Sequence, residues 1–406
     1  MALIISKLLR AGPYAQHATL RALSMRLRLC YAHAMSARSA HKEPLAAPFP
    51  MLMNLLALDL ESAERLVRDL GWPRYRAQQI FRWLYRGRVR DIERMTDLSQ
   101  AERAQLRTIA TIGRFQDCHI VKSTDGTRKF LIRLEDDLIV ESVLIPEDGW
   151  LTLCLSSQVG CTLDCGFCLT GRMGLKRNLK AHEIVDQVLT IQDRLEPGET
   201  LTNLVLMGMG EPLANLDAVT EAVVRLTNSH WGVGIPARRI TLSTAGLAPR
   251  LKDVAALGVN LAVSLNATTN AQRDQLMPAI NRLHPLNTLL AACRAYPLPP
   301  RQRLTFEYVL LAGVNDTEQD ARRLTKLLSG MRCKVNLIPF NEFNGSGFQR
   351  PDDDTVLRFQ SVLRRAGFHA FIRKSKGRDV LGACGQLGRL PESREPAILT
   401  PVGAGC

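Results

Sequence analysis

The segment Cys161-Thr-Leu-Asp-Cys165-Gly-Phe-Cys168 brings three thiols together on one short stretch of chain. The 406 residues contain ten cysteines, too sparse for a disulfide scaffold, so we expect reduced thiols that bind metal. Three cysteines can hold three irons of a four-iron cluster and leave the fourth iron open to a ligand. The alternative is a structural zinc site, which needs four ligands and would have to recruit His182 or Cys154.

Strand-like and helix-like segments alternate around the cysteine segment. Strands are expected near residues 151, 203, 239, 260, 303 and 334, and helices at residues 181–195, 216–228, 286–296, 318–328 and 354–366. Strands that alternate with helices indicate right-handed βαβ units and a parallel sheet. We therefore predict an α/β fold built on a partial (β/α)6 barrel, in which the loops after the strands form the active site.

Polar and glycine residues gather at the expected strand ends. Besides the cysteine segment, these ends are residues 208–212, 243–244, 264–266 and 339–341. Taken singly, each has a structural explanation, because the same residue types cap helices and form turns. Their joint position at the carboxyl ends of parallel strands predicts a binding site.

Two further regions precede the barrel. Apolar residues recur at helical spacing over residues 58–70, 76–85 and 98–109, which predicts a small helical domain. Residues 127–134, 138–145 and 151–155 read as strands between Asp-Gly or acidic turns. The predicted domains are a basic disordered leader (1–52), a helical accessory domain (53–115), a β-rich connector (116–150), the barrel (151–375), a cysteine loop (376–390) and a flexible tail (391–406).

The leader is rich in arginine. Residues 1–42 contain seven basic side chains and no Asp or Glu, which is typical of an organelle transit peptide. An alternative is a start codon assigned too far upstream, with Met51 or Met53 as the true first residue. We expect a cytoplasmic protein, or a mitochondrial or plastid one if the leader is a transit peptide. No apolar run approaches the roughly 20 residues that cross a bilayer, so no membrane partner is expected.

The charge balance favours a polyanionic partner. The chain has 53 Lys and Arg against 39 Asp and Glu, a net charge of +14, and its hydrophobic content of 46% is ordinary for a globular protein. Nucleic acid is the leading candidate. Arginines recur through one predicted helix and the residues that follow it, at positions Arg74, Arg76, Arg82, Arg86, Arg88 and Arg90.

Aromatic residues are interleaved with these arginines. The arginines could neutralise phosphates while Tyr75, Trp83 or Tyr85 stack on exposed bases. Alternatively, Phe81 and Leu84 pack inward and the arginines form a solvated helix face. The residues alone leave both interpretations open.

The C-x3-C-x2-C spacing after the first barrel strand resembles the radical S-adenosylmethionine (SAM) superfamily. In that superfamily the open iron binds the amino and carboxylate groups of SAM, and reductive cleavage yields a 5′-deoxyadenosyl radical. Seven motifs, in order over roughly residues 55–390, narrow the resemblance to the RlmN/Cfr family, whose members methylate adenine carbons in RNA. The motifs are Val140-Glu141-Ser-Val-Leu-Ile-Pro146, Cys154-Leu-Ser-Ser-Gln-Val-Gly-Cys161, Gly208-Met-Gly-Glu-Pro-Leu213, Leu242-Ser-Thr-Ala-Gly246, Val263-Ser-Leu-Asn-Ala267, Asn336-Leu-Ile-Pro-Phe-Asn341 and Ala383-Cys-Gly-Gln-Leu387.

The resemblance implies two cofactors, a [4Fe-4S] cluster and SAM. Cys161, Cys165 and Cys168 would ligate the cluster. The residues that would hold SAM are Gly210, Glu211, Ser243, Ser264, Leu265, Asn266 and Asn341. Glu211 can pair with the SAM ammonium, and short Ser and Asn side chains can hydrogen-bond ribose and carboxylate groups. Many relatives carry His at the position of Asn266, and Asn can also donate and accept.

The resemblance also implies three catalytic residues. Cys384 would carry the methyl group, because an aromatic C–H carbon offers no nucleophile for direct transfer from SAM. Cys154 would form a disulfide with Cys384 and so release the product, and Glu141 would act as general base. Without the resemblance, a strand Cys is usually a small buried hydrophobe and a strand Glu usually faces solvent.

The expected function is therefore radical SAM methylation of RNA. The product would be 2-methyladenosine in 23S rRNA, at the peptidyl-transferase centre, and in tRNA, next to the anticodon. The target adenine must be single-stranded or extruded, because a base inside a helix cannot reach Cys384. We expect a monomer that takes electrons from a donor such as flavodoxin or ferredoxin. The alternatives are Cfr-like methylation of adenine C8 and a non-catalytic, metal-stabilised RNA-binding protein.

Overall fold

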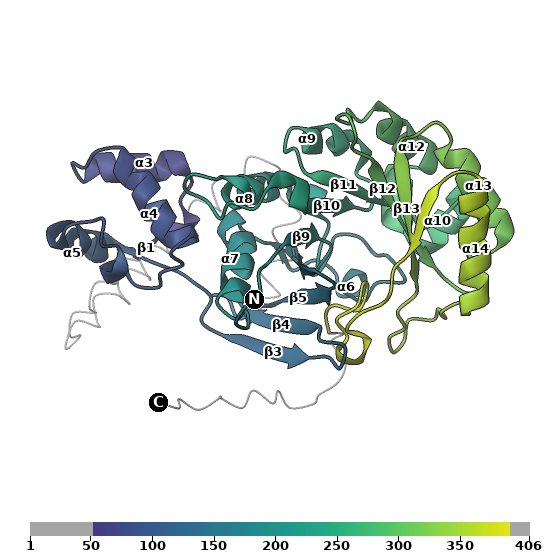
Figure 1. The fold of residues 1–406 in the computed structure, drawn as a ribbon, viewed down its shortest axis with the longest axis horizontal. Helices are drawn as coiled ribbons and strands as arrows, with labels where there is room; N and C mark the ends of the chain where they lie inside the picture. Colours follow the sequence, from purple (N-terminus) through teal and green to yellow (C-terminus); the bar gives the residue numbers. More distant parts are fainter. Residues whose placement is uncertain (1–51, 390–406) are drawn as a thin grey trace, which may run out of the picture. The chain divides into compact units, whose positions relative to one another are not determined.

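The computed structural model describes residues 52–389 (Figure 1). The predicted tail and nearly all of the predicted leader lie outside these residues. No helix among the described residues is long and apolar enough to cross a membrane. The predicted α/β fold, with a partial parallel barrel and an N-terminal helical region, is confirmed by the elements that follow.

Short helices form the N-terminal domain, in nearly the predicted places. Its elements are β1 (Met53–Asn54), η1 (Leu55–Ala57), α3 (Leu60–Asp69), α4 (Tyr75–Tyr85), η2 (Ile92–Arg94), α5 (Gln100–Ile109) and β2 (Ala110–Thr111). Local side chains fix where the helices begin. The carboxylate of Asp59 accepts from the Ser62 amide before α3, and Ser99 with Glu102 forms a capping box at α5.

A ten-stranded sheet forms the centre of the described chain (Figure 1). Seven neighbouring strands, from β14 to β6 in spatial order, are parallel, and β5, β4 and β3 continue the sheet in antiparallel fashion. From edge to edge the strands are β14 (His369–Ile372), β13 (Cys333–Pro339), β12 (Leu304–Leu310), β11 (Asn260–Ser264), β10 (Ile240–Thr244), β9 (Asn203–Leu206), β6 (Trp150–Cys154), β5 (Ile139–Glu147), β4 (Arg128–Arg133) and β3 (Cys118–Lys122).

The sheet differs from the expectation in two ways. The predicted β-rich connector is not a separate layer, because β5 pairs with β6 and places Val143 opposite Cys154. The apolar stretch at residues 368–372 forms β14, a seventh parallel strand beside β13. The sheet keeps two open edges, β14 and β3, so the barrel is partial, as predicted.

The barrel strands present apolar residues to the helices and polar residues to the interior. Helices α7 (Ala181–Gln192), α8 (Leu216–Thr227), α12 (Leu286–Ala295), α13 (Glu318–Leu328) and α14 (Asp353–Arg365) follow the strands along the chain. Tyr308 of β12, for example, packs on Phe359 of α14 with ring centroids 5.3 Å apart. The alternate positions Glu307 and Asn336 face the interior, because strand side chains alternate between faces.

Smaller elements complete the barrel. They are β7 (Gln158–Val159), α6 (Leu169–Arg172), β8 (Arg177–Asn178), η3 (Pro212–Asn215), η4 (Ala237–Arg239), η5 (Ala248–Arg250), α9 (Leu251–Ala255), α10 (Asn270–Leu276), α11 (Pro278–Leu283) and η6 (Arg378–Val380). The short helices α9 to α11 were not predicted, because segments of five to seven residues carry too few turns for a clear helical period.

A buried ion pair joins the helical region to the barrel. The fully buried guanidinium of Arg114 donates to the carboxylate of Asp186 on α7, and also to Asp193 Oδ2 at 2.9 Å. The second carboxylate oxygen of Asp186 accepts from the Phe115 amide at 2.6 Å. Both charges are removed from water, so each depends on the other for its stability.

We predict that Arg114→Ala lowers the free energy of unfolding by about 3–5 kcal/mol, because it leaves the Asp186 carboxylate buried without its partner. Urea denaturation followed by circular dichroism measures the change. Arg65→Ala is the control, since Arg65 pairs with Glu61 on an exposed face of α3 and such pairs contribute little. Equal unfolding midpoints for the two variants would contradict the prediction.

Candidate functional site

A cavity of about 150 Å³ lies at the carboxyl ends of the parallel strands. We call it the donor cavity. It brings together most of the residues predicted from the strand ends, and these are Cys161, Cys165, Cys168, Gly210, Glu211, Ser243, Ser264, Asn266, Asn341 and Cys384. Leu265 does not line it, because its side chain is fully buried on the other face of the strand end.

A second cavity of about 170 Å³ adjoins the first on the inner face of the barrel. We call it the acceptor cavity. Cys154 lines it, together with polar side chains of β12, β13 and the chain after β14. Cys384, Asn341 and Glu307 line both cavities. Cys384 therefore lies where the two cavities meet.

The three clustered cysteines are half-buried residues in a largely apolar environment that encloses their thiols. Burial raises the pKa of Cys161 to about 12, and it also raises the pKa values of Cys165 and Cys168. Nearby side chains such as Phe167 and Phe340 exclude water. Deprotonated thiols in such a place need a cation beside them, and iron would supply one. The residues present therefore fit an iron–sulfur cluster.

The zinc alternative receives no support from the described residues. None of their His, Cys, Asp and Glu side chains form a group of three or more that could hold one metal ion. His182 lies on α7 and lines neither cavity, and Cys154 lines only the acceptor cavity. The absence of three ligands to one metal ion does not argue against an iron–sulfur cluster, because each cysteine of such a cluster binds a different iron.

Two glycines allow the loops around the donor cavity to approach closely. Gly160 has φ +78°, and a Cβ there would lie 1.8 Å from the carbonyl oxygen of Gly174. Gly210 has φ +101°, and its Cβ would lie 2.6 Å from that of Gln158. A side chain at either position would strain the backbone and push the loops apart.

Glu211 is deeply buried, and its carboxylate holds the backbone around the cavity. One oxygen accepts from the Leu213 amide at 3.0 Å, and the other accepts from the Ala245 amide at 2.7 Å. Burial raises the pKa of this carboxyl group. Glu211 also lines the donor cavity, where a ligand ammonium would stabilise the charged form of its carboxylate.

Asn266 and Asn341 occupy special positions. Asn266 has φ +57°, a left-handed conformation in which Asn and His are both enriched, which is consistent with either residue at this position. Its Oδ1 accepts from the Val309 amide at 2.9 Å. Asn341 donates from Nδ2 to the Cys384 carbonyl at 3.1 Å, and its Oδ1 is buried without a hydrogen-bond partner. That oxygen is available to a ligand donor such as an ammonium or hydroxyl group.

Glu307 is a site residue that the sequence analysis did not select. It lies on β12, is buried, and accepts from Asn336 Nδ2 at 2.8 Å. Its pKa is raised by burial. The available signal was the alternation Thr305-Phe-Glu307 on β12 and Lys334-Val-Asn336 on β13, since polar residues at every second position indicate a polar barrel interior.

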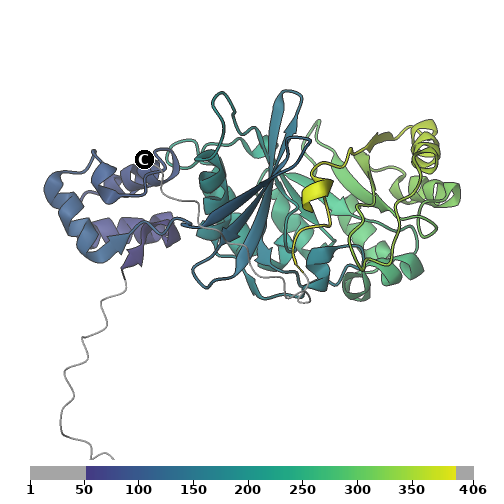
Figure 2. The ribbon, with the colours of Figure 1, turned by 90° about the horizontal axis from the view of Figure 1, so that it is seen from below.

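The loop that carries Cys384 crosses the antiparallel end of the sheet (Figure 2). We call residues 376–389 the cysteine strap. At its start, Asp379 accepts from the hydroxyl of Ser123 at 2.6 Å and from the Thr124 amide at 3.1 Å. Asp125 accepts from the Gly377 amide at 2.8 Å. These contacts attach the strap to the β3–β4 turn.

The second half of the strap is attached to the cysteine segment. The Gly385 carbonyl accepts from the Leu169 amide at 2.7 Å, and the Leu387 carbonyl accepts from the Thr170 hydroxyl at 2.6 Å. Cys384 as a whole is an exposed residue, but protein atoms surround its thiol group. Burial and the negative charge of Glu307 raise its pKa to about 11.

Cys154 and Glu141 lie on the strap-facing side of the sheet. All described cysteines are free, so the predicted disulfide is not present in this structure. Burial and the nearby Cys384 thiol raise the pKa of Cys154, and both cysteines line the acceptor cavity. Glu141 is 3% exposed, accepts from the Gly388 amide at 3.2 Å and lies 3.5 Å from Lys129 Nζ. It lines neither cavity and does not face solvent.

The arginines of residues 74–90 are largely committed to internal contacts. Arg76 pairs with Glu102, Arg88 and Arg90 pair with Asp193, Arg74 pairs with Glu64, and Arg86 donates to the carbonyls of Ser229 and Gly232. Within the described chain, only Arg82 of the six lacks such a partner.

The predicted stacking role of Tyr85 is wrong, because its ring is buried against Phe81 and its hydroxyl accepts from Arg225 at 3.2 Å. Phe81 and Leu84 are also buried, as the structural alternative predicted. Tyr75 remains exposed on α4, and Trp83 is partly buried. Long-range ion pairs and core packing thus account for many of the arginine and aromatic side chains of residues 74–90.

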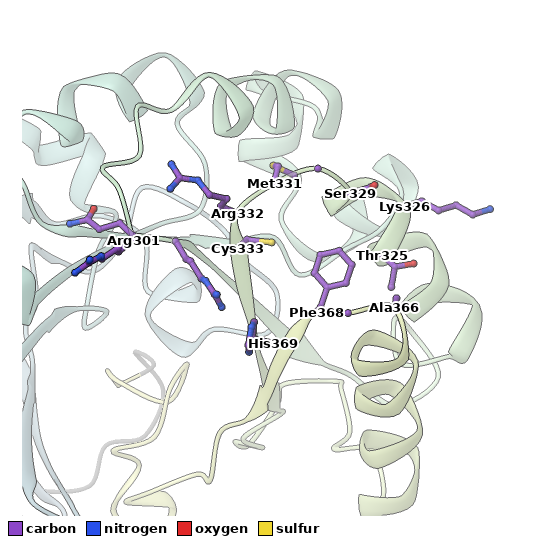
Figure 3. Close-up of a pocket in the computed structure, with 14 residues that line it drawn as sticks. Arg301, Thr325, Lys326, Ser329, Met331, Arg332, Cys333, Ala366, Phe368 and His369 are labelled. Carbon is purple, nitrogen blue, oxygen red and sulfur yellow. The ribbon is translucent and has the colours of Figure 1, made fainter.

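A wider hollow lies at the amino ends of β12, β13 and β14 (Figure 3). Its basic side chains include Arg301, Arg303, Lys326 and Arg332, and it contains no acidic residue. Arg332 donates to the carbonyls of Leu298 and Pro299. The hollow contains none of the predicted site residues. It is larger than the two cavities, but the clustered cysteines and Cys384 lie at the other ends of the strands.

Two family models match the chain. The model of the ribosomal RNA large subunit methyltransferase N-terminal domain matches residues 53–112, and that of the radical SAM superfamily matches residues 155–325. A crystal structure of a radical SAM methyltransferase from Sphaerobacter thermophilus superposes with a TM-score of 0.77 at 44% identity. The match covers 82% of this chain and 98% of that one.

Curated relatives match over most of their length. The dual-specificity RNA methyltransferase RlmN of Desulfosudis oleivorans is 50% identical over 314 residues, which cover 77% of this chain and 84% of the relative. The protein of the same name from Geobacter sulfurreducens is 48% identical over 356 residues, which cover 87% of this chain and 96% of the relative.

We predict that Asp379→Ala slows disulfide formation between Cys154 and Cys384 about tenfold under a mild thiol oxidant. Loss of the Ser123 and Thr124 contacts frees the strap, which lowers the effective concentration of one thiol at the other. Mass spectrometry of the alkylated protein over time measures the rate. Asp353→Ala, a change on an exposed helix start, is the control. An unchanged rate in the Asp379 variant would show that these contacts do not position Cys384.

Proposed function

The chain belongs to the RlmN family of radical SAM RNA methyltransferases, and from this premise we propose that it forms 2-methyladenosine in RNA with Cys384 as the methyl carrier. One observation supports the proposal above all. Cys384 lies between a cavity lined by the three clustered cysteines and a second cavity lined by Cys154. A residue that receives a methyl group on one side and delivers it on the other needs such a position.

Family membership implies a [4Fe-4S] cluster and SAM. We propose that Cys161, Cys165 and Cys168 hold the cluster, and that the polar residues of the donor cavity hold SAM. When bound, the two supply a methyl group and, by reductive cleavage of SAM, a carbon-centred radical. Glu211 and the unpaired Oδ1 of Asn341 would accept from the SAM ammonium or hydroxyl groups. Leu265 would contribute through its backbone, since its side chain is buried elsewhere.

The protein's own thiols perform two steps in this proposal. The Cys384 thiol gives up its proton and takes the methyl group as a thioether. The methyl carbon would then lose one hydrogen atom to the SAM-derived radical and bond to the adenine ring, whose substituted carbon loses a proton and whose surplus electron would pass back to the iron–sulfur cluster. The Cys154 thiolate then attacks the Cys384 sulfur, so that an S–S bond forms and the sulfur–carbon bond breaks. The released carbon takes a proton and becomes the methyl group of the product. A dithiol reductant must reduce the disulfide before the next turnover.

Glu141 is our proposed general base for the proton on the substituted adenine carbon. In the resting structure its carboxylate holds the strap through the Gly388 amide and lies beside Lys129. To reach the ring, the carboxylate must exchange these contacts for the substrate. A base that is coupled to the strap in this way would act only after the strap has moved.

The remaining proposals follow from family and charge. The relatives named dual-specificity RNA methyltransferases support more than one RNA substrate, and we propose that these are 23S rRNA and tRNA, methylated at carbon 2 of adenine. We propose a cytoplasmic monomer that accepts electrons from flavodoxin or ferredoxin, since those relatives are bacterial. The arginine leader on which an organelle location was considered lies outside the described residues.

We predict that anaerobically reconstituted protein with SAM, reductant and unmodified rRNA or tRNA produces 2-methyladenosine, detected by nucleoside mass spectrometry. Cys384→Ala abolishes the product, because the methyl carrier is lost. Cys154→Ala stalls with the RNA covalently attached to Cys384, which a gel shift under denaturing conditions detects. Cys293→Ala, a buried cysteine away from both cavities, retains activity. The appearance of 8-methyladenosine instead would overturn the carbon-2 assignment, and product formation by Cys384→Ala would overturn the carrier.

We predict that replacing Cys161, Cys165 or Cys168 with Ala removes most of the iron and acid-labile sulfide from the purified protein, since a cluster held by two thiolates is lost readily. Elemental analysis and the visible absorption spectrum measure the loss. Cys118→Ala, on β3, serves as the control and keeps wild-type iron. Stoichiometric zinc without iron in the wild-type protein would contradict the assignment.

A further inference from the structure

Four basic residues line the acceptor cavity beside Cys384. Lys334 lies on β13, Arg373 and Lys374 directly follow β14, and Lys376 is the first residue of the strap. We call them the basic rim. We propose that the basic rim binds the phosphates that flank the target adenosine, so that the acceptor cavity receives the extruded base. This inference rests on the proposed function and assigns its RNA contacts to particular residues.

The charges of the basic rim are mostly free. Lys334, Lys374 and Lys376 form no ion pair within the described chain, and Arg373 has only a contact with Glu147, with N and O 3.9 Å apart and both side chains about half exposed. Glu307 and Glu147 are the acidic residues of the cavity, so four cations face two carboxylates. A cluster with excess positive charge repels itself, and bound phosphates would relieve that repulsion.

A hydroxyl group within the rim also lacks a partner. Ser375 lines the acceptor cavity between Lys374 and Lys376, and its buried Oγ makes no hydrogen bond. A phosphate oxygen would accept from this hydroxyl while the neighbouring ammonium groups neutralise its charge. The rim therefore offers both positive charge and a hydroxyl donor, and a phosphate group can bind to both.

The interior of the acceptor cavity suits a single base. Its volume of about 170 Å³ and its enclosed inner wall admit one extruded base rather than a base pair. Glu307 lines the cavity together with Cys384, and its carboxylate carries acceptor oxygens for an exocyclic amine. The base would thus meet Cys384 at one end while its flanking phosphates rest on the rim.

Other basic groups fit this role less well. The arginines of residues 74–90 are mostly paired internally, and the hollow in Figure 3 lies at the amino ends of the strands, away from Cys384. Its residues Arg303 and Lys326 nevertheless provide a matched control, because neither forms an ion pair within the described residues. Removing them changes the net charge by the same amount as removing two rim lysines.

The test compares two double variants of the full-length reconstituted protein with unmodified tRNA as the probe. Binding is measured at several salt concentrations. We expect Lys374→Ala with Lys376→Ala to weaken binding at least tenfold and to reduce the slope of log K against log salt by about 1.4, because each single-strand phosphate contact contributes about 0.7. Lys374→Arg with Lys376→Arg should keep the wild-type slope. Arg303→Ala with Lys326→Ala should also keep it.

Two outcomes would overturn the inference. One is an unchanged salt slope in the Lys374 and Lys376 alanine variant, and the other is an equal loss of slope in the Arg303 and Lys326 control. Iron content and thermal unfolding of both variants show whether they fold as the wild type does. If the wild-type protein binds tRNA with the expected salt slope but forms no methylated adenosine, the proposed function fails while the phosphate contacts stand.

Discussion

The pairing of β5 with β6 is the constraint on which the site depends. It extends the parallel barrel with an antiparallel sheet and so places Cys154, Val143 and Glu141 on one continuous surface. The strap lies across that surface and is attached at both ends, to the β3–β4 turn and to the segment after Cys168. Without the antiparallel extension, Cys384 would have no support opposite the cysteine segment.

Many charged residues are likewise committed to contacts within the protein. Arg114 is buried and ties the N-terminal region to α7 through Asp186. Arg225 of α8 is also buried; it pairs with Glu221 on the same helix and donates to the Leu56 carbonyl and the Tyr85 hydroxyl of the N-terminal region. Several arginines of the 74–90 segment are also held by carboxylates or carbonyls. Lys334, Lys374 and Lys376, which form no ion pair within the described residues, lie instead around the acceptor cavity. Net charge alone therefore indicates a partner class but not the surface that meets it.

Much of the fold follows from local signals in the sequence. The helices at residues 181–192, 216–227 and 318–328 begin and end close to the predicted positions, because their apolar spacing is regular and their first turns are marked by capping or polar residues. The ordered motifs at the strand ends place Cys161, Glu211, Ser243 and Asn341 together without any knowledge of the fold. Local periodicity and motif order are sufficient for these features.

Other features depend on contacts between residues far apart in sequence. No local pattern reveals that Tyr85 packs into the core beside Arg225, or that Glu141 meets Gly388. The side chain of Leu265 is buried and does not line the donor cavity, because a motif identifies a segment whereas the strand alternation decides which of its side chains face the cavity. Glu307 was missed for the opposite reason, since it lies inside the barrel wall and not at a strand end.

The strap also has a consequence for the order in which the molecule is assembled. Its anchoring hydrogen bonds to the β3–β4 turn, to Glu141 and to the segment after Cys168 join residues separated by 216 to 256 positions, and it is made after the barrel during synthesis. Chains fold from the N-terminus as they emerge, so the barrel and the cysteine segment can form while the strap is still missing. A chain that still lacks residues 376–389 could therefore bring its three clustered cysteines together before Cys384 reaches them. Only the last segment to be made brings Cys384 to the wall of the cavity that the three cysteines line.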